Sequence, residues 1–134
     1  HFLFNTLNAI STLILVKENK TANAMVTKLS EFLRYSLDKD PMKRVSLNSE
    51  LQALRLYLDI EQVRFEERLQ VNFDIAGDCK LALVPSMILQ PLAENAIKHA
   101  VAVQEQGGEI KVSVYRFAND LLIELSDNGL TLTL

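Results

Sequence analysis

The sequence holds little of what a disulfide framework, a membrane span or a nucleic-acid surface requires. Cys79 is the single cysteine, so no internal disulfide can form, and a lone thiol fits a reducing compartment. No apolar run approaches the roughly 20 residues that cross a bilayer as a helix. With 14 basic and 17 acidic residues the net charge is −3, which offers nucleic acid no basic surface. The composition therefore argues against a secreted disulfide scaffold and against a nucleic-acid-binding protein.

What is present is enough to build a core. Apolar residues make up 49% of the 134 residues, which suits one ordinary domain or two small ones. The chain opens on His1 without a methionine, and it stops at Leu134 in an alternation of threonine and leucine. We therefore expect it to be a piece of a longer protein.

Residues 1–40 predict a helical hairpin. Apolar residues recur at helical spacing along two stripes, with the polar segment 17–20 between them and Thr21 as the expected N-cap of the second helix. The stripes are Leu3, Leu7, Ile10 and Ile14 in the first helix, and Met25, Leu29, Phe32 or Leu33, and Leu37 in the second. Both are too apolar for a lone hairpin in water, so we expect them to bury against a partner, most simply a second copy.

Residues 45–134 predict a different architecture, in which the apolar period changes from helical to alternating. The expected elements are a linker over 38–44, a short strand at 45–47, a helix over about 48–67 capped by Asn48, strands at 70–75, 109–117 and 120–127, and a helix over 86–100. Pro91 should kink the last helix or mark where it begins. The order of elements predicts an α+β fold, in which a helical hairpin is joined to an α/β sandwich.

The most informative stretch lies in that last helix. Glu94, Asn95, Lys98 and His99 place an acid, an amide, an ammonium and an imidazole within one and a half turns. Carboxylate and amide oxygens suit Mg²⁺, with Asn95 the better ligand and Glu94 placed to order a metal-bound water, while lysine and histidine suit phosphate. The segment therefore predicts a metal-nucleotide face, and the alternative is a solvated polar face on a core helix.

Two further groups of residues could carry chemistry. His1 and Asn5 stand at i and i+4, so a nucleophilic imidazole and an amide that could position a water or a phosphoryl group share one helix face. Asp127-Asn128-Gly129 ends a predicted strand, where the acid could accept a hydrogen bond from an exocyclic amine and the glycine admits a ligand to the backbone. The alternatives are a solvated chain end and a plain β-turn.

Taken together, these patterns resemble the sensor histidine kinases of the LytS type, which belong to the GHKL ATPase superfamily. The resemblance covers essentially the whole chain. Residues 1–8 look like the phosphoacceptor box, 29–35 and 57–65 like two internal signatures, 85–99 like the N box, and 127–129 like the start of the first glycine box. Five matches in the family's order and spacing are more specific than any one of them.

The resemblance implies a reaction and its partners. His1 would accept the γ-phosphoryl group of ATP and pass it to an aspartate of a response regulator receiver domain, and Asn5 would assist phosphatase chemistry. Residues 1–40 would form the dimerisation and phosphotransfer hairpin of a homodimer, and 45–134 a partial ATP-binding domain. The chain would lie in the cytoplasm, within a parent protein associated with the inner or plasma membrane.

The resemblance also assigns the nucleotide site. The residues concerned are Asn95 for Mg²⁺ with Glu94 beside it, Lys98 and His99 for the phosphates, Asp127 for the adenine amine and Gly129 for the pocket wall. The arrangement requires that the Asn95 amide and the Asp127 acid line opposite walls of one cleft. The signature at Arg64 and Phe65 receives no role from the physics.

The chain departs from the family pattern after Gly129, where the family usually has a second glycine and this sequence has residues 130–134. No later glycine-rich box follows, so we expect this stretch to lack some of the backbone donors that wrap the phosphates. One alternative is a nucleotide-free module for dimerisation and signal relay. Another is a GHKL ATPase or serine kinase of a different class. A purely helical structural protein would instead lack the three predicted strands.

Overall fold

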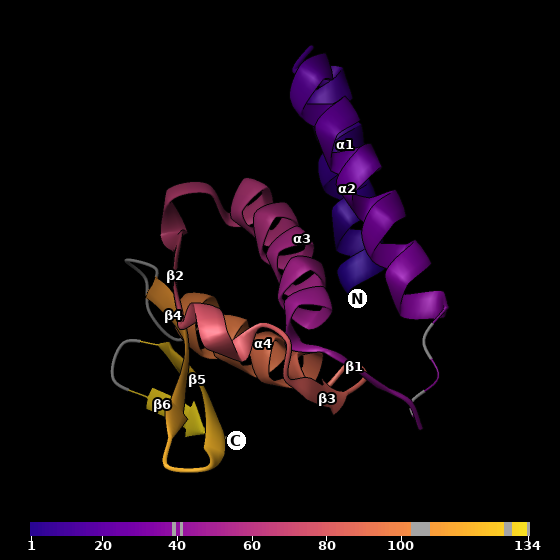
Figure 1. Cartoon of the computed structure of the whole chain (residues 1–134). Helices are drawn as coiled ribbons and strands as arrows, with labels where there is room; N and C mark the ends of the chain where they lie inside the picture. Colours follow the sequence, from indigo (N-terminus) through magenta and orange to yellow (C-terminus); the bar gives the residue numbers. More distant parts are fainter. Residues whose placement is uncertain (39, 41, 103–107, 128–129, 134) are drawn as a thin grey trace.

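The N-terminal region is a helical hairpin (Figure 1). The computed structural model describes the backbone of residues 1–38, 40, 42–102, 108–127 and 130–133, and the side chains of 1–38, 40, 42–100 and 108–126. Helix α1 (Phe2–Leu15) and helix α2 (Asn19–Leu37) lie side by side and are joined by a short turn. The predicted hairpin is confirmed. Within the described part of the chain, no helix combines the length and hydropathy that crossing a bilayer would require.

The prediction of Thr21 as the N-cap of α2 was wrong. The helix begins two residues earlier, at Asn19, and Glu18 occupies the N-cap position without a side-chain capping bond. Lys17, with φ of 65°, makes the turn, and the Glu18 amide donates a hydrogen bond to the Leu13 carbonyl at 2.8 Å. The turn is therefore closed by backbone bonds from α1, which leaves no position where Thr21 would be needed as a cap.

Helix α3 (Leu47–Phe65) joins the hairpin to the rest of the molecule. Ser46 caps it, because its Oγ accepts a hydrogen bond from the Ser49 amide at 3.2 Å, so the prediction of Asn48 as the cap was wrong. Strand β1 (Arg44–Ser46) leads directly into the cap and pairs antiparallel with β3 (Leu83–Pro85). This small ribbon fixes where α3 begins.

A four-stranded sheet forms the other layer. Its order is β2-β4-β5-β6, with β2 parallel to β4 and the remaining pairs antiparallel. The strands are β2 (Leu69–Ile75), β4 (Gly108–Phe117), β5 (Asp120–Asp127) and β6 (Leu130–Thr133). The three predicted strands and the α+β class are confirmed, and the purely helical alternative is wrong. Strand β6 was not predicted, although its threonine-leucine alternation is typical of a strand.

Helix α4 (Leu89–Ile97) continues into the π-helical turn η3 (Lys98–Ala102). The predicted start at residue 86 was three residues too early, because Met87 has a φ of 62° that no helix accommodates. Pro91 is the third residue of α4, where a backbone N–H has no intrahelical acceptor, so it neither kinks nor breaks the helix. Pro91 thus lies close to the true beginning of the helix, as expected.

Helices α3 and α4 pack on one face of the sheet and enclose the main core (Figure 1). Its buried side chains include Leu51, Leu54 and Leu58 of α3, Ala93, Ala96 and Ile97 of α4, and Ile110, Val112, Val114, Ile123 and Leu125 of the sheet. A second cluster in the hairpin contains Ile10, Ala22, Met25, Leu29 and Ile60. Helix α3 contributes to both clusters, and the predicted division into residues 1–40 and 45–134 stays a prediction.

Candidate functional site

The polar residues of the predicted metal-nucleotide face lie together. Glu94, Asn95, Lys98 and His99 are all exposed, whereas Ala93, Ala96, Ile97 and Ala100 on the other side of the same turns are buried in the core. The pairs Glu94–Lys98 and Asn95–His99 stand at i and i+4, the spacing that makes side chains neighbours on a helical surface. The small alanines let α4 pack closely on the core and leave the four polar side chains facing outward.

The donor set on this face suits a hydrated magnesium ion. The Glu94 carboxylate and the Asn95 amide both supply oxygen, which is the ligand atom that Mg²⁺ prefers. In the regions with described side chains, no group of three or more histidine, cysteine, aspartate or glutamate residues could hold a metal by itself. Mg²⁺ commonly takes one or two protein ligands and completes its shell with water and phosphate oxygens, so the residues present fit this ion.

The phosphoacceptor candidates lie at the start of the hairpin. His1 is exposed at the N-cap position of α1 and makes no side-chain capping bond. The Asn5 amide N–H donates to the His1 carbonyl at 2.9 Å, so the two residues are helical neighbours at i and i+4, as the spacing predicted. An exposed imidazole that makes no capping hydrogen bond at the helix end is accessible to a second reactant.

Phe2 anchors this end of the hairpin to α3. Its ring stacks on Tyr57 with the centroids 4.8 Å apart and meets Phe32 edge-on at 5.5 Å. Aromatic pairs at such separations add about 0.5–1.5 kcal/mol beyond the area that they bury. Because Phe2 is the residue next to His1, this packing fixes where the imidazole-bearing end of α1 meets α3.

A partly buried polar pair lies near the C-terminal end of α3. Arg64 Nη1 is 3.2 Å from both oxygens of Glu61, whose side chain is only 3% exposed. Burial raises the pKa of Glu61, and although the Arg64 guanidinium pulls it down, the nearby Glu94 carboxylate raises it further. Burial also raises the pKa of the Tyr57 phenol, with further contributions from Glu61 and Glu94. Tyr57 and Glu61 are therefore electrostatically coupled to the α4 face.

Sequence reasoning singled out residues 57–65 as a signature but gave Glu61 and Arg64 no role. The missed signal is their spacing. Tyr57, Glu61 and Arg64 stand at i, i+4 and i+7, which places three polar groups along one side of the helix.

Of the two remaining candidates, Asp127 and Gly129, the structure describes only the backbone of Asp127. The backbone of Asp127 pairs with Ile110 on one side and with Leu130 on the other, and α4 packs on β5, the strand that Asp127 ends. The side chain of Asp127 and the whole of Gly129 lie outside the described residues. The cleft expected between Asn95 and Asp127 therefore stays a prediction.

A family model described as histidine kinase matches residues 1–69 of the chain. That match includes the exposed His1, the aromatic anchor on α3 and the Glu61–Arg64 pair. It ends at the first residue of β2, before the polar face of α4.

Curated relatives extend the similarity over both regions. The sensor protein LytS of Staphylococcus saprophyticus subsp. saprophyticus is 42% identical over 129 residues, which is 96% of this chain and 22% of that protein. The sensor histidine kinase/phosphatase LytS of Staphylococcus aureus is 38% identical over 130 residues, with the same coverage. The sensor histidine kinase BtsS of Escherichia coli K12 is 39% identical over 129 residues, 96% of this chain and 23% of that protein. The chain thus spans just over a fifth of each of these relatives.

Proposed function

This chain belongs to the histidine kinase family, and we propose from that premise that it is the catalytic part of a two-component sensor kinase. In the proposed reaction a ring nitrogen of His1 attacks the γ-phosphorus of ATP. The new nitrogen–phosphorus bond forms while the bond to the β–γ bridging oxygen breaks, ADP leaves, and the ring proton passes to solvent. The phosphoryl group then moves to an aspartate of a response regulator.

One observation carries the proposal: two elements far apart in the sequence meet at α3. Phe2 holds the His1 end of α1 against Tyr57 of α3, and Tyr57 belongs to the same buried cluster as Ala93 of α4. The acceptor end and the polar face of α4 are therefore both adjacent to one stretch of α3. Phosphoryl transfer depends mostly on positioning and charge neutralisation. An arrangement in which the imidazole-bearing end of α1 and the polar helix α4 both pack against α3 suits that chemistry.

The residues on α4 receive matching roles. Asn95 would bind Mg²⁺, with Glu94 beside it, and Lys98 and His99 would contact phosphate oxygens. The ion, when bound, neutralises charge on the transferred phosphoryl group. Asn5, one turn from His1, would orient the phosphoryl group or a hydrolytic water. The name of one relative includes phosphatase as well as kinase, which supports the second task for Asn5.

The proposal includes a homodimer on the cytoplasmic side of a membrane-associated parent protein. Several large apolar side chains of α1 are 41–79% exposed, namely Leu3, Phe4, Leu7, Ile14 and Leu15. A second hairpin laid against this face would bury them in a four-helix arrangement. The receiver domain of the regulator would then reach His1 at the exposed end of the bundle.

The decisive experiment measures phosphate on His1 in the full-length protein. With labelled ATP and Mg²⁺, we expect an acid-labile, base-stable phosphoryl group that His1→Gln abolishes. Asn95→Ala should weaken Mg·ATP binding by at least about tenfold, roughly 1.4 kcal/mol, without lowering the melting temperature. Asn23→Ala, on an exposed position of α2, is the matched control.

Three results would contradict the proposal. Phosphate on a serine, or unchanged labelling after His1→Gln, would favour another class of GHKL enzyme. The absence of both binding heat and a thermal shift with Mg·ATP would favour a nucleotide-free relay module.

A further inference from the structure

Glu50 on α3 is a buried acid that the proposed reaction does not use. Its side chain is 3% exposed, and both carboxylate oxygens accept hydrogen bonds. The Tyr35 hydroxyl of α2 donates to one oxygen, and the Ile88 backbone N–H donates to the other at 3.0 Å. A single carboxylate thus joins α2, α3 and the residue that precedes α4.

The chemistry of these bonds makes them strong. A buried carboxylate must be hydrogen-bonded, and bonds to an ionised acceptor are about twice as strong as neutral ones. Burial and the hydrogen bond to Glu50 raise the pKa of the Tyr35 phenol, so Tyr35 keeps its proton and remains a donor. Removing the hydroxyl would leave one oxygen of a buried charge without this donor.

Ile88 is a sensitive place to hold the chain. It occupies the N-cap position of α4, directly after Met87 with its left-handed φ of 62°, so a small backbone change here redirects the whole helix. The negative charge of Glu50 also complements the positive end of the helix dipole. The hydrogen bond from Ile88 therefore fixes both the position and the electrostatics of the first turn.

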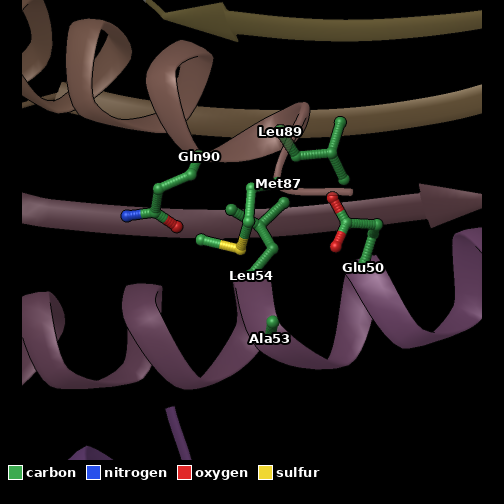
Figure 2. Close-up of a pocket in the computed structure, with 6 residues that line it drawn as sticks. All are labelled: Glu50, Ala53, Leu54, Met87, Leu89 and Gln90. Carbon is green, nitrogen blue, oxygen red and sulfur yellow. The ribbon is translucent and has the colours of Figure 1, made fainter. Parts of the chain in front are cut away.

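The side chains around this point leave only a small gap, so hydrogen bonds to Glu50 act beside apolar contacts between α3 and the start of α4. Figure 2 shows Glu50, Ala53 and Leu54 of α3 facing Met87, Leu89 and Gln90 across a pocket. The cavity volume is about 10 Å³, roughly the space of one water molecule, and Leu54 and Leu89 on its walls are 1% and 2% exposed.

We propose that Tyr35, Glu50 and the Ile88 N–H form a latch through which α2 positions α4. The inference rests on the proposed function, because α4 carries Glu94 and Asn95. Tyr35 and Glu50 are positioning residues that contact no nucleotide. A shift of α2 would change the tilt of the first turn of α4, so the hairpin and the nucleotide face would be coupled through this carboxylate.

The test compares two tyrosines in the full-length protein. Tyr35→Phe removes the latch hydroxyl. Tyr115→Phe is the matched control, because the Tyr115 hydroxyl also donates to a glutamate, Glu124, at 2.9 Å, on the exposed face of the sheet. We expect Tyr35→Phe to accelerate amide hydrogen exchange at Ile88 about tenfold and to raise KM for Mg·ATP by about fivefold, with a smaller change in kcat. The control should change neither quantity.

Each outcome decides the proposal. Equal exchange rates and equal KM values in the two variants would overturn the latch. Faster exchange with an unchanged KM would leave only a structural role and would also overturn it. If Tyr35→Phe does not fold, Glu50→Gln keeps the shape of the side chain and removes its charge, and it should also accelerate exchange at Ile88.

The exchange measurement needs no nucleotide, so the two levels of inference fail separately. If the wild-type protein neither binds Mg·ATP nor phosphorylates His1, the proposed function fails and the positioning role falls with it. The exchange rates would still report whether Tyr35 secures the start of α4. If the wild-type protein does both and Tyr35→Phe matches the control, only the latch fails.

Discussion

The two regions of the molecule close their apolar surfaces in different ways. The α/β region covers one face of its sheet with α3 and α4, and the other face carries mainly polar side chains such as Asn72, Lys111 and Glu124. The hairpin buries one side of α1 and α2 against α3 but leaves a row of large apolar side chains on α1 exposed. The exposed large apolar residues of the α/β region form smaller groups, such as Leu81 with Leu83 and Tyr115 with Phe117. The hairpin therefore presents the larger exposed apolar surface, which is where the proposed dimer contact would form.

Helix α3 also differs from the two hairpin helices at its N-terminus. Neither α1 nor α2 has a side-chain cap at its N-terminus, whereas α3 begins with the Ser46 cap and Glu50 in its first turn. Isolated helices of this length are marginal in water, so uncapped helices depend on tertiary packing for their stability. Helix α3 has its own N-terminal cap and packs against both regions. The hairpin therefore depends on α3 for its stability.

Truncating one leucine in each region should give the largest difference. Leu58 is 1% exposed in the main core, and Leu58→Ala should lower the free energy of unfolding by about 2–5 kcal/mol. Leu7 is 49% exposed, and Leu7→Ala should cost less than about 1 kcal/mol in the monomer. Urea denaturation of both variants at low protein concentration checks this. Equal losses would mean that the row on α1 is already buried within one chain.

A charge placed on the α1 row should separate association from folding. Leu7→Glu should weaken self-association at least about tenfold, which is roughly 1.4 kcal/mol, because the carboxylate would be desolvated in a hairpin–hairpin contact. Sedimentation equilibrium of the full-length protein measures it. Asn23→Glu, which adds the same charge on the exposed side of α2, is the comparison and should leave association unchanged. Undiminished association in Leu7→Glu would place the dimer contact elsewhere.

Much of the fold could be predicted because alternation and helical spacing are local signals. The strand over 69–75 was predicted to within one residue, since its apolar positions alternate without interruption. The predicted stripe on α1 was harder to interpret. Ile10 is buried while Leu3 and Ile14 are exposed, because α1 has apolar residues on two sides and spacing alone does not tell which side α3 covers.

The site was predictable only where its residues are neighbours in sequence. The α4 face was found because Glu94, Asn95, Lys98 and His99 cluster within a few residues. Glu50 was not recognised, because its partners lie 15 residues before it and 38 residues after it along the chain. In the sequence, such a carboxylate only interrupts the apolar pattern of the helix. Its role becomes visible when the fold brings those partners within hydrogen-bonding distance. The prediction of the N-cap failed for the same reason, since the pairing of β1 with β3 makes Ser46 rather than Asn48 the N-cap of α3.

Removing the Ser46 cap should sharpen the contrast between helix ends by a smaller amount. Ser46→Ala should cost about 1 kcal/mol, because the Ser49 amide loses its acceptor. Glu18→Ala at the start of α2 should cost less, since that side chain makes no capping bond. Thermal unfolding of the two variants measures the difference. A larger loss from Glu18→Ala would show that the turn between α1 and α2 depends on that side chain.

The smallest expected effect is a pH trend at Glu61, where α3 packs against both regions. Tyr57, Arg64 and Glu94 surround this carboxyl, and burial, more than its neighbours, raises its pKa above the ordinary 4.5. The fold thus favours protonated Glu61, whose stabilising contribution is complete below pH 4.5 and is lost as the pH rises through the raised pKa. A glutamine at this position has no charge to bury, so the melting temperature of Glu61→Gln should increase relative to wild type from about pH 4 to about pH 7. Glu67→Gln controls for the loss of an exposed charge. A relative decrease would mean that the ion pair with Arg64 outweighs the burial of the carboxylate.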